Sequence, residues 1–348
     1  MQLIISLIYR IGIIESASMC LLVTNTLTFC LYAADKRKAA KGRWRISEKI
    51  LVFFTIAFGG IGALAGMCIM KHKIRKMNFR IAVVTGLAIT LIPAIHIIHG
   101  LTLDRMIQYE EIEFRSSNWP SELDGYRIAL IADTHAIEDE EIQRVATELN
   151  SRSLDLLIIG GDFSMENSHY QGTVRELAQI TATDGIFGVE GNHDDYIVVF
   201  EAFEQYGITP LDNSGVYIGD GFYLAGIRDL WNRSPSIQDA VAGAGANDFT
   251  LLVSHNPDVS MMQPTGGIDL ILSGHTHGGQ VTFFGYPFYL LYDGGLPITD
   301  YGTRFAHGFA NSADGVPVYV TRGIGTFTFM PRVFSRPEVV IFTMISGA

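Results

Sequence analysis

The sequence predicts an α/β or α+β fold with a large sheet, preceded by a helical transmembrane region. Three apolar stretches without Asp, Glu, Lys or Arg stand in the first 105 residues, and from residue 126 short apolar runs alternate with amphipathic stretches. The charge divides at the same place, because residues 1–105 carry a net charge of +10 and the remainder −21. We therefore expect two parts of different character.

The apolar stretches, residues 17–34, 50–70 and 81–99, each have roughly the 20 residues that a bilayer core requires. Residues 1–14 lack the basic start and the small-residue cleavage site of a signal peptide, so the stretches predict retained membrane segments. The expected organisation is a helical membrane region over 1–103, a linker over 104–123 and a catalytic domain over 124–348. The expected location is a cell (inner) membrane, crossed several times.

The charge pattern alone does not fix the orientation, because basic residues flank the middle stretch on both sides, over 36–49 and 71–80. A full crossing would place one of these clusters outside, against the positive-inside bias. The run Gly59-Gly60-Ile61-Gly62 permits a broken or re-entrant hairpin, shielded by protein neighbours, that returns the chain to the same side. The hairpin predicts an extracytoplasmic catalytic domain, whereas three full crossings would leave that domain in the cytoplasm.

Residues 20–85, approximately, resemble a small bacterial membrane family of unknown function. The resemblance rests on Asp35-Lys36, Trp44-Arg45-Ile46-Ser47-Glu48, Gly59-Gly60 and His72-Lys73. It implies membrane residence without implying any chemistry, so this region is expected to be an anchor.

Composition excludes several classes of protein. With 48% hydrophobic residues and no low-complexity tract, the chain is not intrinsically disordered. The strongly acidic second part would be repelled by a phosphate backbone, so no nucleic-acid partner is expected. The three cysteines, Cys20, Cys30 and Cys68, provide neither a disulfide framework nor a zinc site.

The second part is expected to alternate strands and helices. Helical spacing predicts helices over 138–150, 171–181 and 195–206, and a Gly-Asp-Gly turn predicts a hairpin over 216–227. Short apolar runs predict strands over 126–133, 154–162, 186–192, 249–256, 268–275, 316–323 and 338–344.

Polar residues of metal-ligand type follow five of these strands. Loops beyond the carboxyl ends of sheet strands are where α/β folds bind their ligands, so these side chains predict one convergent site. The candidates are Asp133, His135, Asp162, Asn192, His255, His275 and His277.

The donor types indicate the chemistry of this site. Imidazole nitrogen mixed with carboxylate oxygen suits Mn, Fe or Zn better than Ca or Mg. Seven donors are too many for one tetrahedral ion but fit two ions that share a ligand, which would clamp a phosphoryl group and acidify a water. His193 is then free to stabilise phosphoryl charge or to protonate the leaving group, and Asp194 could orient it. Arg228, Asp229 and Trp231 either line the substrate mouth or form a surface ion pair and a packed aromatic.

The ordered blocks resemble the calcineurin-like metallophosphoesterase superfamily over residues 124–345. They are Asp133-x-His135, Gly161-Asp162, Gly191-Asn192-His193-Asp194, His255 and Gly274-His275-x-His277. The continuation His277-Gly278-Gly279-Gln280 is similar to a membrane-associated bacterial phosphodiesterase branch, which includes enzymes acting on UDP-2,3-diacylglucosamine.

The resemblance implies a four-layer αββα sandwich and a division of the ligands. Asp133, His135, Asp162 and His277 would hold the first metal. Asp162, as the bridge, would hold the second metal together with Asn192, His255 and His275.

The expected function is that of a membrane-anchored, dinuclear-metal phosphohydrolase. It would hydrolyse phosphodiester or pyrophosphate bonds of a phosphorylated small-molecule or lipid-linked substrate, by attack of a metal-bridging hydroxide. Two alternatives stay open: a lipid-linked pyrophosphatase such as a UDP-2,3-diacylglucosamine hydrolase, and a non-catalytic metal-binding sensor or scaffold. The pattern leaves the metals, the physiological substrate and the oligomeric state open.

Overall fold

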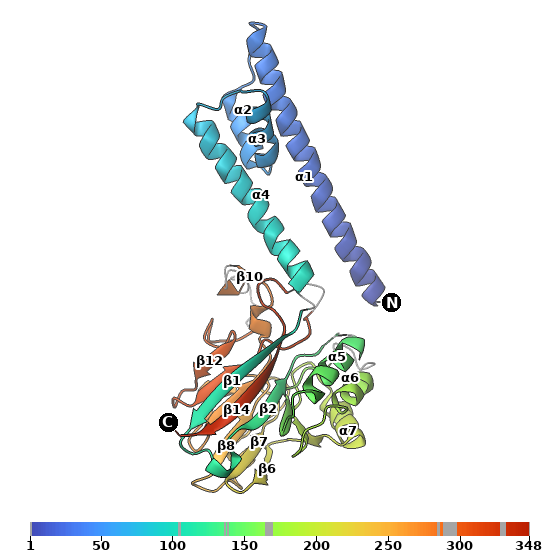
Figure 1. Cartoon of the computed structure of the whole chain (residues 1–348), viewed down its shortest axis with the longest axis vertical. Helices are drawn as coiled ribbons and strands as arrows, with labels where there is room; N and C mark the ends of the chain where they lie inside the picture. Colours follow the sequence, from blue (N-terminus) through green and yellow to red (C-terminus); the bar gives the residue numbers. More distant parts are fainter. Residues whose placement is uncertain are drawn as a thin grey trace. The chain divides into compact units, whose positions relative to one another are not determined.

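The computed structural model describes residues 2–103, 106–135, 137, 139–163, 170–283, 286–287, 298–327 and 332–347. The side chains of residues 2–17, 93, 96, 97, 99–101 and 103 also lie outside the description. The chain divides into two compact units, Met1–His99 and Gly100–Ala348 (Figure 1).

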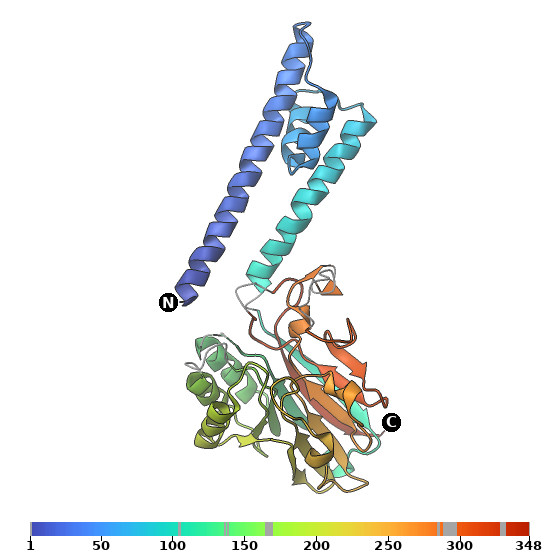
Figure 2. The same ribbon diagram turned by 180° about the vertical axis from the view of Figure 1, so that it is seen from behind.

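Four helices build the N-terminal unit: α1 (Gln2–Ala40), α2 (Glu48–Ile56), α3 (Gly60–Ile69) and α4 (Met77–Leu103). The helices α2 and α3 form a short hairpin beside α1 and α4, as Figures 1 and 2 show from opposite sides. Glycines permit this packing, because a β-carbon at Gly62 would lie 2.0 Å from the carbonyl oxygen of Asn25. The Asn25 side chain also accepts a hydrogen bond from the Gly62 backbone at 2.8 Å and donates one to the Phe58 carbonyl at 2.9 Å, which fixes the turn.

The three stretches expected to cross a membrane lie in these helices. Within the described part of the chain, however, none of the helices combines the length and the apolar character that a crossing requires. The stretch 50–70 is divided between α2 and α3, and helices of 9 and 10 residues rise only about 15 Å, half of a bilayer core of about 30 Å. The competing reading, a full crossing by 50–70, is therefore wrong, and the break predicted at the glycines is confirmed. Part of the stretch 81–99 falls on side chains outside the description.

The motif residues of the N-terminal unit meet around the buried carboxylate of Asp35. Its Oδ2 lies 2.8 Å from His72 Nε2 and accepts a hydrogen bond from Arg45 at 2.9 Å. A second pair, Lys73 with Glu48 at 2.7 Å, continues the network. The loops between α1 and α2 and between α3 and α4 are thus tied to one another, which brings the two basic clusters to the same end of the unit.

Two six-stranded sheets form the second unit. The first has the order β1-β14-β2-β3-β4-β5, and its strands from β2 to β5 are parallel. Its bounds are β1 (Gln108–Ser116), β2 (Tyr126–Ile131), β3 (Leu156–Ile159), β4 (Ile186–Gly188), β5 (Thr209–Pro210) and β14 (Glu338–Ser346).

The second sheet has the order β12-β13-β9-β8-β7-β6, in which β13, β9, β8 and β7 are parallel. Its bounds are β6 (Ser214–Gly219), β7 (Phe222–Gly226), β8 (Phe249–Val253), β9 (Leu270–Ser273), β12 (Gly308–Asn311) and β13 (Pro317–Val320). A separate two-stranded ribbon pairs β10 (Thr282–Phe283) with β11 (Tyr286–Pro287).

Three apolar interfaces separate four layers. The helices α5 (Asp139–Asn150), α6 (Tyr170–Leu177) and α7 (Tyr196–Tyr206) cover the outer face of the first sheet, for example through Val145 and Leu149 (Figure 1). Side chains such as Ile128 and Phe249 pack between the two sheets. The four-residue helices α8 (Ile237–Ala240) and α9 (Val259–Met262) contribute to the outer face of the second sheet. The mixed α/β fold with two sheets is confirmed.

The predicted linker contains a strand that the sequence analysis missed. β1 pairs in parallel with β14 along nine residues each, from Gln108 opposite Glu338 to Ser116 opposite Ser346. Since β14 also pairs with β2, the second unit begins at the residues that were expected to connect the two parts.

Candidate metal centre

The seven predicted metal-ligating residues converge at the carboxyl ends of five strands. Each of these strands is short and buried, and the candidate ligands follow it in the next loop. Loops after β2, β3 and β4 of the first sheet and after β8 and β9 of the second carry these side chains. The site therefore lies where the edges of both sheets meet.

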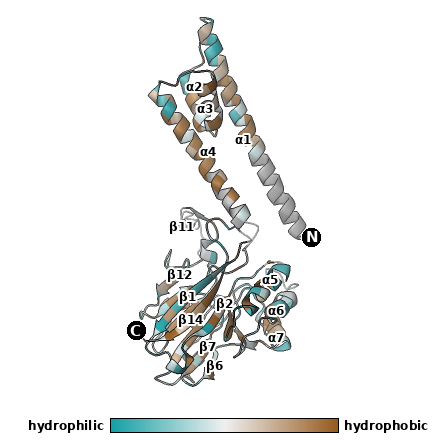
Figure 3. Cartoon of the chain, in the orientation of Figure 1, coloured by the Kyte–Doolittle hydropathy of each residue, from teal (hydrophilic) through white to brown (hydrophobic). Residues whose placement is uncertain are grey.

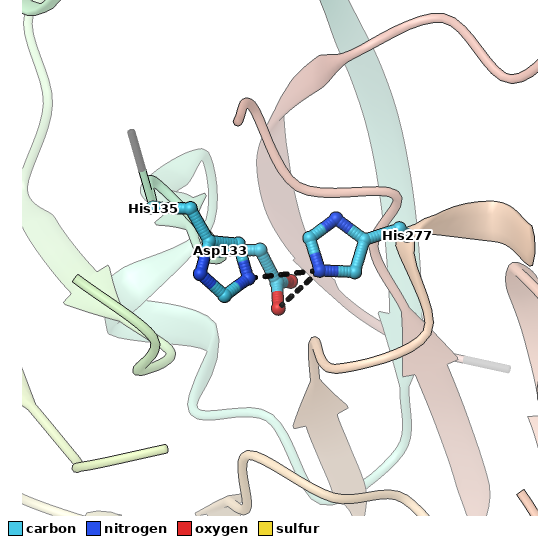
Figure 4. A group of neighbouring side chains, drawn as sticks. All are labelled: Asp133, His135 and His277. Carbon is cyan, nitrogen blue, oxygen red and sulfur yellow. Dashed lines mark hydrogen bonds and ion pairs between the residues drawn. The ribbon is translucent and has the colours of Figure 1, made fainter. Parts of the chain in front are cut away.

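Asp133, His135 and His277 form the first group of possible metal ligands. All three side chains are buried, and their ligand atoms lie within 4.8 Å of one another. The Nε2 atoms of His135 and His277 are 3.0 Å apart, and His277 Nε2 is 3.5 Å from Asp133 Oδ1, so the three side chains point toward a common centre (Figure 4).

Asp162, His255 and His275 form the second group, also buried and within 4.8 Å. Asn192 joins them, because its Oδ1 lies 2.8 Å from His275 Nδ1 and 3.1 Å from His255 Nε2. The opposite ring nitrogens face backbone carbonyls, with His255 Nδ1 2.7 Å from the Gly160 oxygen and His275 Nε2 2.8 Å from that of Ile298. These contacts orient the two rings toward Asn192 and Asp162.

One carboxylate oxygen faces both groups. Asp162 Oδ2 lies 3.3 Å from His255 Nε2 in the second group and 3.5 Å from His135 Nε2 in the first. The other oxygen, Oδ1, accepts a hydrogen bond from the backbone of His193 at 2.9 Å, which holds the carboxylate in this position. The two groups therefore share Asp162.

The backbone at these residues is strained. Non-glycine residues rarely adopt a positive φ, yet five of the seven candidates do so. They are Asp133, His135, Asp162, His275 and His277, with φ between 41° and 73°. Such strain persists only where the surrounding structure fixes the conformation, and it concentrates at functional sites.

Two motif glycines are required by close approach to the carboxylates. A β-carbon at Gly191 would lie 2.2 Å from Asp162 Oδ1, and one at Gly274 would lie 2.6 Å from Asp133 Oδ2. The glycines that precede Asn192 and His275 in the sequence blocks therefore make room for the carboxylates of other loops.

The electrostatics fit divalent cations. Burial lowers the pKa of His135 to about 4 and that of His275 to about 3, so both imidazoles are neutral and have a lone pair available near pH 7. Burial raises the pKa of Asp133 to about 7. Burial acts on Asp162 in the same sense, but the charge and hydrogen bond of His255, together with the charges of His135 and His193, outweigh it and hold the pKa of Asp162 well below its usual range. Neutral nitrogens beside carboxylates are the donor set that Mn, Fe and Zn prefer.

The side chain of His193 is exposed and its ring centre lies 5.5 Å from that of His135. The carboxylate of Asp194 accepts hydrogen bonds from the backbones of Gly191 (2.7 Å), Asp162 (2.8 Å) and Phe163 (2.9 Å), so it joins two ligand loops. The expected action of Asp194 on the His193 ring stays a prediction.

The structure adds Arg332, which the sequence analysis missed. Its side chain is 1% exposed and donates to the carbonyls of Gly325 (2.8 Å), Arg322 (2.7 Å) and His277 (3.2 Å). Arg332 Nη2 also lies 3.3 Å from His277 Nδ1. No local pattern in the sequence could have revealed a residue that reaches His277 from 55 positions away.

The loop after β7 does not form the surface ion pair that was one reading of Arg228 and Asp229. Arg228 instead pairs with Asp212 at 2.7 Å, and Asp229 is buried. Trp231 lies against His275, one of the candidate ligands, with ring centres 4.5 Å apart. The other reading, in which this loop lines the substrate mouth, agrees with the placement of Trp231.

Comparison with known proteins agrees with this geometry. Residues 126–279 match the family model of the calcineurin-like phosphoesterases. The chain contains a calcineurin-like phosphoesterase domain. Residues 25–79 of the N-terminal unit match the model of a protein family of unknown function, DUF1294. Both resemblances drawn from the motifs are confirmed, and the protein is a metal-dependent phosphoesterase.

Relatives carry the same domain. The uncharacterized metallophosphoesterase YkuE of Bacillus subtilis is 27% identical over 69% of this chain and 86% of that protein. Phosphodiesterase YaeI of Escherichia coli is 28% identical over 68% of this chain and 88% of its own length. A Danio rerio protein named transmembrane protein with metallophosphoesterase domain is 26% identical over 83% of this chain and 69% of that protein.

Proposed function

We propose that the phosphoesterase domain hydrolyses phosphodiester or pyrophosphate bonds with two divalent cations, Mn, Fe or Zn, that share Asp162. The observation that carries this proposal is the position of Asp162 Oδ2 between His255 and His135, at 3.3 and 3.5 Å. A pair of cations bound there would supply a clamp for phosphoryl oxygens and an acidified water as nucleophile. A phosphodiesterase among the relatives supports the reaction class.

The residues of the chain have separate tasks in this proposal. The first group holds one cation and the second group, with Asn192, holds the other, while Asp162 serves both. His193 follows Asn192, is exposed, and lies beside His135, so its ring reaches a phosphoryl group placed between the two groups. From there it protonates the leaving oxygen or stabilises charge on the phosphoryl oxygens.

The test uses the full chain in detergent, with Mn²⁺ and bis-p-nitrophenyl phosphate. Asp162→Asn and His193→Ala are expected to lose most of the turnover, and the loss of a proton-transferring group at residue 193 corresponds to about a hundredfold or more. His307→Ala is the matched control, because His307 is exposed and belongs to neither ligand group. Unchanged turnover in both site variants would refute the mechanism. Turnover by the wild-type chain in the same assay would exclude a non-catalytic sensor or scaffold.

We also propose that the N-terminal unit associates with a membrane. Most of the exposed large apolar side chains among the described residues belong to this unit, and the coloured parts of its helices in Figure 3 are mostly hydrophobic. They include Leu22, Val23, Phe53, Ile81 and Val84. A relative named as a transmembrane protein supports the same association.

The extracytoplasmic location of the phosphoesterase domain stays a prediction. An alkaline phosphatase fusion after residue 105 tests it, since the reporter is active only outside the cytoplasm, and an inactive fusion would overturn the outward assignment. Membrane association also favours a lipid-linked substrate as the second candidate. Hydrolysis of UDP-2,3-diacylglucosamine compared with that of a soluble cyclic nucleotide separates the two substrate classes.

A further inference from the structure

Two aromatic side chains border the two ligand groups, one beside each. The ring centre of Trp231 lies 4.5 Å from that of His275, in the second group, and the planes are nearly perpendicular at 88°. The ring centre of Phe327 lies 5.1 Å from that of His193 and 6.0 Å from that of His135, in the first group. Trp231 is 53% exposed and Phe327 is half-buried, so both rings retain accessible surface beside the site.

A buried carboxylate fixes the position of Trp231. Asp229 Oδ2 accepts hydrogen bonds from the backbones of Trp231 (2.9 Å) and Asn232 (2.7 Å). The Asn232 side chain then donates to the carbonyl of Asn192 at 2.5 Å. The loop that carries Trp231 is therefore attached to a loop that carries a candidate ligand.

A buried amide fixes the position of Phe327 in a similar way. Gln280 Oε1 accepts a hydrogen bond from the Phe327 backbone at 2.7 Å, and Gln280 Nε2 donates to the Phe327 carbonyl at 2.6 Å. Gln280 follows His277 by three residues and has a strained φ of 46°. The glutamine of the sequence motif thus connects the first ligand group to an aromatic ring.

We propose that Trp231 and Phe327 determine specificity by stacking on the two ester groups of a phosphodiester whose substituents carry planar unsaturated rings, such as aryl or nucleoside groups. This inference rests on the proposed hydrolysis of phosphodiesters. A diester has one substituent on each side of phosphorus, which matches one ring beside each ligand group, whereas a monoester would use only one of them. Rings held by their backbones offer flat contact area with little loss of side-chain entropy.

The experiment measures binding of non-hydrolysable diester analogues to the full chain with Mn²⁺, by calorimetry. Diphenylphosphinate has two planar substituents, dimethylphosphinate has two small ones, and dibutylphosphinate has two apolar but flexible ones. We expect the wild-type chain to bind diphenylphosphinate most tightly. Trp231→Ala and Phe327→Ala should each weaken that binding about two- to tenfold and leave dimethylphosphinate unchanged.

Conservative and distant variants separate stacking from damage to the fold. Trp231→Phe should retain most of the affinity for diphenylphosphinate. Phe309→Ala removes an aromatic ring that is 51% exposed on β12 and stacks on Phe114, and it should change nothing. Circular dichroism of each variant checks that it is folded.

Three results would overturn the inference, and the first two are unchanged affinity for diphenylphosphinate in both alanine variants and binding of dibutylphosphinate as tight as that of diphenylphosphinate. Failure of the wild-type chain to bind diphenylphosphinate would do the same. Hydrolysis of bis-p-nitrophenyl phosphate by the wild-type chain is measured in a separate assay, which tests the proposed function. If the chain is active but lacks this binding pattern, only the proposed stacking by Trp231 and Phe327 is rejected. If the chain is inactive, the proposed function is rejected.

Discussion

Arg332 offers the sharpest test of how the metal site is supported. The substitution Arg332→Met introduces an apolar side chain of similar length, which removes every hydrogen-bond donor of the Arg332 side chain. The His277 carbonyl retains the Ser335 hydroxyl as a donor at 2.7 Å, but the carbonyls of Gly325 and Arg322 lose the bonds that Arg332 provides. A buried polar group without a partner costs about 1–3 kcal/mol, so two of them predict a loss of about 2–6 kcal/mol in unfolding free energy.

Arg304 is the matched control for this substitution. It also donates to a carbonyl through two nitrogens, to Asn311 at 2.8 and 3.1 Å, but it is exposed. Water replaces those bonds in Arg304→Met, so its loss should stay below about 1 kcal/mol. The difference between the two variants measures the effect of burial.

Denaturant unfolding followed by tryptophan fluorescence provides the measurement. Trp119 is 3% exposed between the two sheets, and Trp44→Phe and Trp231→Phe leave it as the sole tryptophan of the chain. The midpoint and slope of the transition then report the stability of the phosphoesterase domain. The reasoning fails if Arg332→Met and Arg304→Met lose the same free energy, or if Arg332→Met loses less than about 1 kcal/mol.

Two further outcomes follow from the ligand groups. Burial raises the pKa of Asp133 to about 7, so below that pH a cation must displace a proton from this carboxyl group. The Mn²⁺ affinity measured by calorimetry should therefore fall up to about tenfold per pH unit as the pH decreases from 7. An affinity independent of pH between 5.5 and 7 contradicts this prediction. Gly191→Ala would place a β-carbon 2.2 Å from Asp162 Oδ1, so it should weaken Mn²⁺ binding and cost about 1–3 kcal/mol of stability. Gly266→Ala, with nothing within 4 Å, is its control, and equal effects of the two would count against the close-approach argument.

Much of the second unit could be predicted because its inner strands are buried on both faces. Runs such as 126–131 and 156–159 contain hardly any polar side chain, and a continuous apolar run is a local signal. β1 has no such signal. Its sequence QYEEIEFRS carries three glutamates, and none of its residues is fully buried, so the sequence alone resembles a linker. Only the pairing with β14, which lies far along the chain, identifies it as a strand.

The candidate site also has a part that the sequence predicts and a part that it does not. Convergence of the ligands was predictable, because each follows an apolar run and carboxyl ends of parallel strands meet at one edge. The residues that support them were not. Arg332 reaches His277 across 55 positions and Gln280 reaches Phe327 across 47, and contacts at such separation leave no periodic pattern in the chain. Hydropathy likewise indicated three membrane segments and could not show that 50–70 folds back as two short helices.

The pairing of β1 with β14 has a consequence for synthesis. The two strands are separated by about 220 residues, which a ribosome adds at about 5–20 residues per second, so β1 waits roughly 10–45 s for its neighbour. Until then its edge and that of β2 are both unpaired, since β14 lies between them. The nascent chain therefore keeps two strand edges open to pairing with other chains until β14 emerges.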